Sequence, residues 1–323
     1  MDPAFVLSGV TKTFGGMCAV DKLDLEVPRG TLCGVIGPNG AGKTTTIRIV
    51  MSILFPDSGS VSVLGHRSAL LAKDRIGYLP EERGLYRKMR VGEFLTYMAR
   101  LKGVADGESR TFITRALERL GLAGTEGKRC EELSKGMQQK VQFIAATVHR
   151  PDLLILDEPF SGLDPVSTRM LRELILEEYR RGATVLFSTH VMPHAEQLCD
   201  RVVMIHKGRK VLDEAVATIR HRYDPRSLEF EPLERASDLS PLLQVPGVEG
   251  VETTDGVTRV TLSPGSDPAA AIARITASVP TARIEVARLR LEDVFVQLVA
   301  ADGEGGQAEL RAGLRTAETM GTL

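Results

Sequence analysis

Residues 34–45, GVIGPNGAGKTT, restrict the fold of this chain more than any other stretch. They match the pattern G-x-x-x-x-G-K-[ST] at Gly37, Gly42, Lys43 and Thr44. Residues 31–36, just before the loop, are mostly apolar and predict a buried strand, and the apolar residues after the loop recur at helical spacing. A strand, a glycine-rich turn and a helix in this order predict an α/β fold with a phosphate-binding loop.

The backbone of such a loop explains its chemistry, because glycines let successive N–H groups point inward at phosphate oxygens, and the following helix N-terminus adds positive potential. The residues that we expect to line the phosphates are Gly37, Pro38, Asn39, Gly40, Ala41 and Gly42. We expect Lys43 to reach the β- and γ-phosphates, Thr44 to hold Mg²⁺, and Thr45 to contact the α-phosphate. The alternative is a glycine-rich turn that precedes Lys-Thr by chance, and the flanking strand and helix disfavour it. The loop therefore predicts a nucleotide site.

Length and composition exclude several other classes of protein. The chain has 323 residues, which is enough for one large and one small domain, and its 43% hydrophobic and 26% charged residues are typical of globular proteins. A formal net charge of -1 gives no electrostatic footprint for nucleic acid. No apolar run approaches the ~20 residues that span a bilayer, and the N-terminus lacks a secretory signal pattern. Composition therefore predicts a soluble cytoplasmic protein.

The segments that flank the loop supply two further candidates. Residues 4–30 alternate apolar and polar side chains, which predicts two strands joined by a turn at Gly15–Gly16. Phe14 ends the first of these strands, and it is either a core aromatic or a stacking surface for an adenine ring. The short strand at 75–79 leads into a polar turn that contains Glu81, at the sheet edge where ligands of α/β proteins bind.

Residues 132–150, ELSKGMQQKVQFIAATVHR, predict a helix that begins close to Ser134. Ser134 is a plausible N-cap, and apolar residues at helical spacing follow it. Because a helix that starts here directs free N–H groups outward, the segment is a second candidate anion site. Capped helices are common, so this stretch taken alone favours an ordinary structural helix.

Three polar residues follow buried strands farther along the chain. In LLILDEPFSGLDP (153–165) four apolar residues end in Asp157 and Glu158, and ATVLFSTH (183–190) ends in His190. Continuous apolar strands are typical of a parallel sheet that is covered on both faces. An Asp at such a strand end holds the water shell of Mg²⁺, and an adjacent Glu deprotonates an attacking water.

Taken in order, these motifs resemble those of ABC-type ATPases, the nucleotide-binding subunits of ABC transporters, over roughly the first 220 residues. GPNGAGKTT is similar to the family's Walker A loop and LLILDEP to its Walker B strand. The resemblance implies that Asp157 is the magnesium carboxylate and Glu158 the catalytic glutamate. It also implies that His190 is the switch histidine and that Lys43 acts in catalysis with it.

The resemblance extends to the segments that meet a partner subunit in this family. LSKGM fills the position of the signature LSGGQ, with Lys135 and Met137 in place of a Gly and the Gln. The resemblance implies that Ser134 and Gly136 contact the γ-phosphate of ATP bound to the partner. SGLD is similar to the D-loop and implies a role at the nucleotide for Asp164.

A further departure narrows the resemblance to one subgroup. Glu81, in GYLPEERGLY, stands where the family has the Q-loop glutamine, which implies a carboxylate near the metal. A carboxylate at this point binds Mg²⁺ more strongly than an amide, but repels the γ-phosphate when no metal is bound. Together with LSKGMQQKVQ and FSGLDPV, this segment looks like bacterial exporter ATPases of the sodium-extrusion type, which carry an extra C-terminal domain.

We therefore expect a P-loop NTPase fold of the ABC ATPase type over residues 1–222, with an antiparallel β subdomain and a helical subdomain at about 85–150. Residues 223–300 predict a small α+β domain of ferredoxin-like order β-α-β-β-α-β. Its expected strands are 227–232, 248–254, 257–263 and 282–289, and its expected helices are 237–245, 267–279 and 291–299. The tail at 301–323 is expected to be disordered.

The resemblance implies a motor subunit of an ABC exporter that binds and hydrolyses ATP with Mg²⁺. Its expected partners are a separate integral membrane permease and a second copy of itself in a head-to-tail homodimer, with no nucleic acid. Its expected location is the cytoplasmic face of the cell membrane, as a peripheral protein. Two alternatives stay open on the sequence, namely the ATPase of an ABC importer and a soluble ABC ATPase without a transport role.

Overall fold

The computed structural model describes residues 2–82, 84–222, 226–234, 237–254, 257–287 and 290–301. The chain forms two compact units. The first comprises Met1–Val216 and the residues from Phe295 onward, and the second is Ala217–Val294. The sequence predicts a domain boundary after residue 222 and a last helix that belongs to the second domain, whereas the units divide after Val216 and after Val294. The disorder expected for 301–323 is wrong for Ala301, which ends the last helix, and the rest of that range lies outside the residues that the structure describes.

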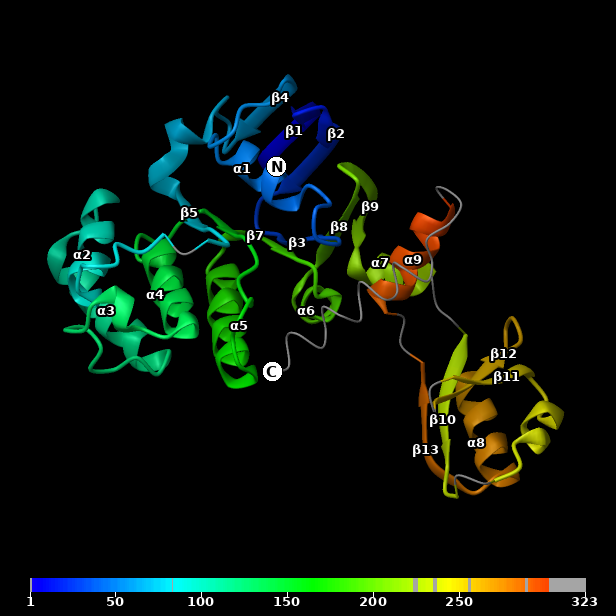
Figure 1. The fold of residues 1–323 in the computed structure, drawn as a ribbon. Coiled ribbons are helices and arrows are strands. Elements are labelled where there is room, and N and C mark those ends of the chain that lie inside the picture. Colours follow the sequence, from blue (N-terminus) through cyan, green and yellow to red (C-terminus); the bar gives the residue numbers. More distant parts are fainter. Residues whose placement is uncertain are drawn as a thin grey trace. The chain divides into compact units, whose positions relative to one another are not determined.

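A six-stranded sheet of order β5-β6-β7-β3-β8-β9 is the centre of the first unit (Figure 1). Its strands are β3 (Leu32–Ile36), β5 (Ile76–Leu79), β6 (Leu153–Leu156), β7 (Thr184–Thr189), β8 (Arg201–His206) and β9 (Arg209–Ala215). All neighbours are parallel except β8 and β9, which form an antiparallel hairpin. Every residue of β3, β6 and β7 is buried, as expected for strands covered on both faces.

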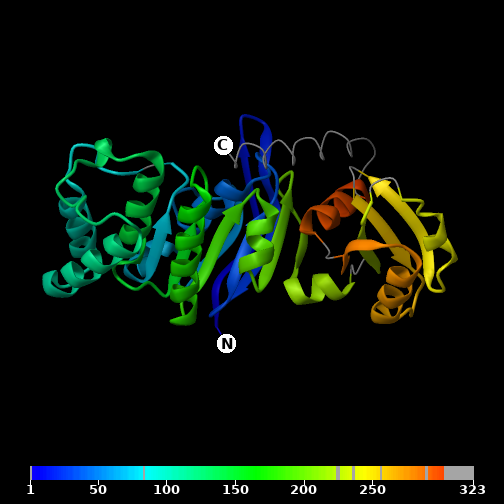
Figure 2. The ribbon, with the colours of Figure 1, turned by 90° about the horizontal axis from the view of Figure 1, so that it is seen from below.

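Helices cover both faces of this sheet (Figures 1 and 2). In Figure 1, α5 (Pro165–Arg180) and α6 (Met192–Leu198) lie on one side, and α1 (Lys43–Val50) lies on the other with the antiparallel sheet. Parallel strands end at a common edge, so the residues that follow β3, β6 and β7 meet there. The predicted nucleotide loop and the predicted acidic residues both lie at this edge.

An antiparallel sheet of order β2-β1-β4 packs on the first unit's core, as predicted. Its strands are β1 (Pro3–Phe14), β2 (Met17–Pro28) and β4 (Ser58–Val63). The predicted turn between β1 and β2 is confirmed, because Gly15 and Gly16 both have positive φ angles and Phe14 pairs with Met17. This hairpin places Phe14 at the end of its strand.

The predicted helical region is also confirmed. Its elements are α2 (Val91–Leu101), α3 (Asp106–Arg119) and α4 (Lys135–Thr147), with the short 3₁₀ segments η1 (Ala69–Arg75) and η2 (Cys130–Glu132) nearby. The three helices share one apolar cluster that includes Phe94, Leu117 and Val141. No helix of the described ranges is long and apolar enough to cross a membrane.

The second unit is a four-stranded antiparallel sheet of order β11-β12-β10-β13. Its elements are β10 (Ser227–Pro232), β11 (Val248–Thr254), β12 (Val257–Leu262), α8 (Pro268–Ser278) and β13 (Thr281–Val286). This order matches the expected ferredoxin-like arrangement, since the first and third strands are central. The linking helix α7 (Val216–Arg222) precedes it and α9 (Leu291–Ala301) follows it.

One predicted helix of this unit is wrong. Residues 237–245 form no α-helix but contain the five-residue 3₁₀ segment η3 (Ser240–Gln244). The segment ends at Val245, which has extended backbone angles of φ -72° and ψ 124°. Pro246 follows, and a residue before proline is disfavoured in the helical region, so the helix cannot lengthen.

Candidate active site

The loop between β3 and α1 needs glycine at two positions. Gly37 and Gly42 have φ angles of +154° and +106°. A Cβ atom would lie 2.2 Å from the Ile205 carbonyl oxygen at the first position, and 2.3 Å from the Ala19 carbonyl oxygen at the second. Gly42 also precedes α1 without any side-chain cap, so N–H groups of the first turn are free to bind an anion.

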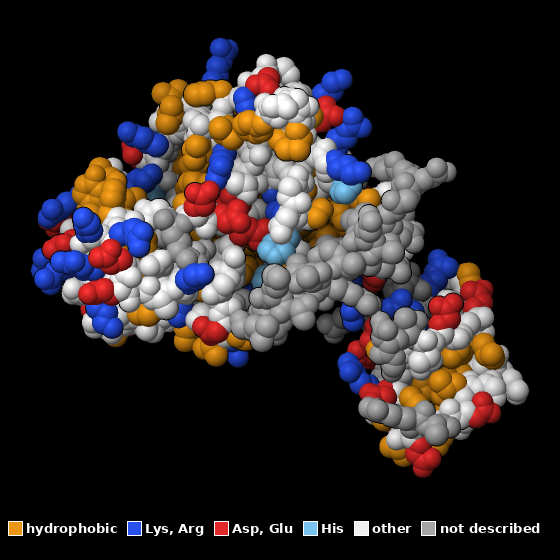
Figure 3. All heavy atoms as spheres, viewed as in Figure 1, with side chains coloured by type: hydrophobic (Ala, Val, Ile, Leu, Met, Phe, Trp, Pro, Cys, Tyr) orange, Lys and Arg blue, Asp and Glu red, His pale blue; other side chains and the backbone are white. Residues whose placement is uncertain are grey.

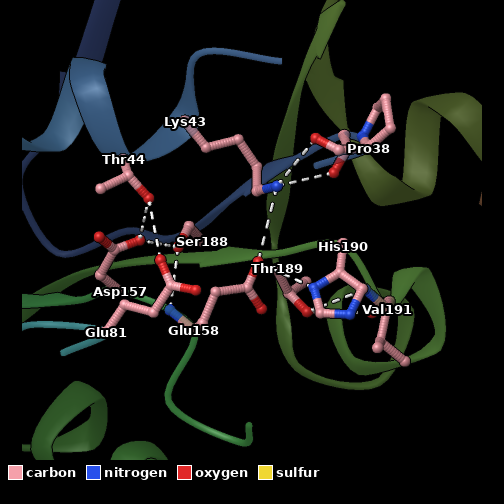
Figure 4. A network of polar contacts seen from close by, with 11 residues as sticks. Pro38, Lys43, Thr44, Glu81, Asp157, Glu158, Ser188, Thr189, His190 and Val191 are labelled. Carbon is pink, nitrogen blue, oxygen red and sulfur yellow. Dashed lines mark hydrogen bonds and ion pairs between the residues drawn. The ribbon is translucent and has the colours of Figure 1, made fainter. Parts of the chain in front are cut away.

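The Lys43 ammonium lies in the centre of a polar network (Figure 4). Its Nζ donates to the carbonyl oxygens of Gly37 at 2.8 Å and Pro38 at 3.1 Å, and lies 3.6 Å from Glu158 Oε1. Only 6% of the residue is exposed. Burial lowers the pKa of Lys43, and the Glu158 carboxylate opposes this shift.

Asp157 lies at the end of β6 and is completely buried. Its Oδ1 accepts hydrogen bonds from Ser188 Oγ at 2.6 Å and from Thr44 Oγ1 at 3.2 Å. Its Oδ2 is buried and has no hydrogen-bond partner among the described residues. Burial raises the pKa of this carboxyl group, and the two hydrogen bonds partly oppose that rise. A buried carboxylate oxygen without a partner, beside a hydroxyl, fits a hard cation.

Glu158 is held in an unusual backbone conformation beside Asp157. Its φ angle is +48°, in the left-handed region that non-glycine residues rarely adopt. Its N–H donates to Ser188 Oγ at 3.0 Å. Its Oε1 lies 3.0 Å from His190 Nδ1, so the carboxylate is between a histidine ring and the Lys43 ammonium. Strained residues of this kind are concentrated at functional sites.

Two other predicted residues lie at the margin of the network. Glu81 is exposed, and its Oε2 lies 3.5 Å from Thr44 Oγ1, the hydroxyl that also contacts Asp157. Figure 3 shows acidic side chains gathered beside histidine on this face of the first unit. Phe14 is 43% exposed, which excludes the core-aromatic alternative, and its ring lies 5.5 Å from Lys12 Nζ.

The remaining loop residues follow the same backbone path. Asn39 and Gly40 are exposed, Ala41 is 3% exposed, and Thr45 is half-buried in the first turn of α1. The Ala41 N–H donates to the Pro38 carbonyl oxygen at 3.2 Å, which tightens the loop. These residues therefore form a short turn that connects β3 to the first turn of α1.

The other predicted residues lie at helix starts. Ser134 is exposed and caps α4, where its Oγ accepts from the Met137 N–H at 3.3 Å. Asp164 caps α5 by accepting hydrogen bonds from the Ser167 N–H at 2.9 Å and the Ser167 Oγ at 2.6 Å, which lower its pKa. Gly136 lies on the first turn of α4. Within the described residues, Ser134, Gly136 and Asp164 make no hydrogen bond or ion pair with the Lys43 network.

Sequence reasoning missed two residues of this site. Ser188 contacts both Asp157 and Glu158, and its signal was its place at the end of a buried strand, two residues before His190. Gln139 of α4 is 3% exposed, and its Nε2 donates to the Pro159 carbonyl oxygen at 3.3 Å. This bond ties the helix that Ser134 caps to the turn after Glu158.

Family comparisons agree with this geometry. Residues 20–161 match the family model of ABC transporters, and residues 215–299 match that of the C-terminal domain of DrrA1-3-like ATP-binding proteins. The ABC transporter ATP-binding protein YhaQ of Bacillus subtilis (strain 168) is 40% identical over 293 residues, which cover 90% of this chain and 97% of YhaQ.

A second relative and a solved structure extend the comparison. The Nod factor export ATP-binding protein I of Paraburkholderia xenovorans (strain LB400) is 34% identical, over 77% of this chain and 84% of that protein. A solved ATP-binding subunit of an ABC transporter superposes with a TM-score of 0.64 and 30% identity, over 68% of this chain and 93% of that one. The chain therefore belongs to the ATP-binding subunits of ABC transporters, a family of enzymes that bind and hydrolyse ATP.

Proposed function

We propose that this protein is the motor subunit of an ABC exporter and drives a separate membrane permease by ATP binding and hydrolysis. One observation carries the enzymatic part, namely the cluster of Lys43, Thr44, Asp157, Glu158 and His190 at the ends of three neighbouring strands. The export direction is supported by the Nod factor export relative and by the DrrA-like C-terminal domain.

In this proposal the loop of Gly37, Pro38, Asn39, Gly40, Ala41 and Gly42 surrounds the phosphates of ATP. Lys43 exchanges its two carbonyl contacts for oxygens of the β- and γ-phosphates, which are better partners for a buried ammonium. Thr45, in the first turn of α1, donates to the α-phosphate. Phe14 is exposed at the strand end and stacks on the adenine ring.

The donor atoms present fit Mg²⁺. The Thr44 hydroxyl and Asp157 would hold the ion, and Glu81 would approach it from the exposed side. Bound Mg²⁺ would neutralise charge that develops on the transferred phosphoryl group. Ser188 fixes Asp157 for this role through the 2.6 Å hydrogen bond to Oδ1, which leaves Oδ2 open.

Glu158 is the proposed general base. It is adjacent to the metal carboxylate, its backbone is fixed by Ser188, and its side chain contacts His190. It accepts a proton from the attacking water, and His190 orients that water and the γ-phosphate. Lys43 stabilises negative charge on the phosphoryl oxygens during the transfer.

The same proposal requires a second copy of the chain. Ser134 caps α4 and Gly136 lies on its first turn, outside the Lys43 network, so they are available to the γ-phosphate of ATP bound to a partner subunit. The two copies would meet head to tail with two-fold symmetry, and Asp164 would lie near the junction. ATP favours the closed dimer because its γ-phosphate contacts both copies there.

The partner and location follow from the transport role. The protein would act at the cytoplasmic face of the cell membrane, bound to a permease encoded as a separate chain. Membership of the sodium-extrusion-type subgroup is the finer part of this proposal, and it is supported by Glu81 and by LSKGM.

Affinity purification from gently solubilised membranes of the native host tests the transport role. The tagged protein should recover a polytopic membrane protein, identified by mass spectrometry, and should sediment with the membrane fraction. The same purification with the Lys43→Ala variant shows whether recovery of the membrane protein requires ATP binding. Recovery of soluble partners alone, without protein in the membrane fraction, would contradict the transport role and leave the ATPase activity in place.

A further inference from the structure

A cavity of about 400 Å³ lies between α3, α4 and α5 of the first unit, lined by residues that the nucleotide site does not use. Figure 1 shows these three helices next to one another, with α4 between α3 and α5. Pockets for small organic ligands measure about 300–1,000 Å³, so this volume suits a small ligand. The cavity therefore lies between two helices of the helical region, α3 and α4, and the helix α5, which covers the central sheet.

The floor of the cavity is apolar. Phe143 and Ile144 of α4 are 2% and 1% exposed, and Val148 follows them at the helix end. Phe112 of α3 and Leu174 of α5 are half-buried and complete the walls. This lining favours a ring or a short hydrocarbon chain, because the transfer of apolar surface from water to an apolar cavity is favourable.

Two of the acidic groups at the cavity are already neutralised. Arg119 forms a two-pronged ion pair with Glu177, in which the Nη1 to Oε2 distance is 2.7 Å. Glu178 accepts from Arg181 Nη2 at 2.7 Å. The Arg119–Glu177 pair also joins α3 to α5 at one end of the cavity, so it fixes the distance between the walls.

The remaining charges give the cavity a positive excess. Arg115, Arg150 and Glu108 line it, and none of them has an ion-pair partner among the described residues. Arg150 also has a φ angle of +51°, a conformation that favours glycine, and its N–H bonds to the Thr147 carbonyl oxygen at 2.9 Å. Two unpaired guanidinium groups against one carboxylate suit a ligand with a single negative charge, since guanidinium binds carboxylate in a two-pronged geometry.

We propose that this cavity binds a small amphipathic anion, with an apolar ring or short acyl chain and one carboxylate. The apolar part packs on Phe143, Phe112 and Leu174, and the carboxylate meets Arg115 and Arg150 at the rim. Because such a ligand contacts α3, α4 and α5 together, it restrains movement of the helical region against the central sheet.

Isothermal titration calorimetry of the full-length protein with octanoate, without nucleotide, tests the proposal. We expect saturable binding with a Kd below about 1 mM, and at least tenfold weaker binding to the Arg115→Glu/Arg150→Glu variant. Ala116→Leu narrows the cavity without a change of charge, and it should weaken octanoate binding as well. Hydrogen exchange with octanoate present should slow in α3 and α5.

Arg110→Glu is the matched control, because Arg110 lies on α3 outside the cavity and the change of charge per site is the same. Octanol and octylammonium serve as neutral and cationic ligands of the same chain length. Retained binding by Arg110→Glu, with weak binding of both control ligands, supports the assignment. Equal binding of octanol overturns the preference for an anion, and equal losses in Arg110→Glu and the double variant overturn the site.

Discussion

The candidate site has two ends, the Lys43 network and the start of α4, and they differ in how many contacts their residues make within this chain. At the Lys43 network, Lys43, Asp157 and Glu158 are 6%, 0% and 6% exposed and contact one another or Ser188. At the start of α4, by contrast, Ser134 is exposed, and among the described residues it bonds only within its own helix. One end is a pre-organised cluster, and the other is an ordinary helix start.

This difference explains why the site needs two chains in the proposed mechanism. The buried network places charges before ATP arrives, so little reorganisation is needed there. The helix start offers free N–H groups, but nothing among the described residues brings them to the Lys43 network. Substitutions at the network should therefore affect a single chain, and substitutions at the helix start should affect only the assembled pair.

Lys43→Ala should have the largest effect, because it removes the ammonium from the buried network. We expect ATP affinity to fall about 100-fold, as for loss of a strong charge-assisted contact. Binding of a fluorescent ATP analogue measures this change. Lys135→Ala removes the same charge at the exposed helix start and should leave the Kd within about twofold. An unchanged Kd for Lys43→Ala would disprove the assigned phosphate contact.

Gly136→Asp tests the start of α4. The new carboxylate would repel the γ-phosphate of a partner's ATP, so hydrolysis should fall by about tenfold or more. ATP binding to the isolated chain should be unchanged, because Gly136 does not contact the Lys43 network. Parallel measurements of Kd and kcat separate the two quantities. Weaker binding in the isolated chain would mean that the two ends are not separate.

Ser188→Ala should have an intermediate effect. Asp157 Oδ1 would keep only the Thr44 contact, and the Glu158 N–H would lose its acceptor. We expect hydrolysis to fall about tenfold and the free energy of unfolding to fall by about 1–2 kcal/mol. Ser167→Ala is the control, because it removes a hydroxyl that contacts Asp164 and not Asp157. It should leave the contacts of the Lys43 network unchanged. Steady-state kinetics and urea unfolding measure both variants.

Phe14→Ala should have the smallest effect. Loss of a stacking surface costs about 1 kcal/mol, so ATP should bind about fivefold more weakly. Stability should change little, since Phe14 is 43% exposed. Met17 pairs with Phe14 across the hairpin and is 69% exposed, so Met17→Ala is the control. Equal nucleotide affinity in both variants would remove Phe14 from the site.

The grouping of the buried polar residues could be predicted from the sequence, for a physical reason. Residues after parallel strands meet at one sheet edge, so Asp157, Glu158 and His190 could be grouped with the loop before their contacts were known. The positive φ of Glu158 and the contacts of Ser188 could not be predicted, because they depend on how the turn after β6 packs against the end of β7. The place of Ser188 at the end of a buried strand marks it as a candidate but does not say which groups it contacts.

Two features of the fold differ from the sequence-based expectation, one for a local reason and one for a long-range reason. The helix expected at 237–245 failed because Pro246 favours extended backbone before it, and that local rule outweighed helical spacing. The last helix was assigned to the second unit, yet from Phe295 onward it groups with the first, where the Phe295 ring lies 5.7 Å from that of His206. No local pattern in the sequence encodes that return.

The most direct test of the two-chain account is the oligomeric state of Glu158→Gln with ATP. This variant keeps the phosphate loop but lacks the proposed base, so it should bind ATP without turnover and accumulate as a dimer. Light scattering after gel filtration should show twice the monomer mass with ATP and Mg²⁺, and the monomer mass with ADP. The double variant Glu158→Gln/Gly136→Asp should stay monomeric. A Glu158→Gln protein that binds ATP yet remains monomeric would contradict the account.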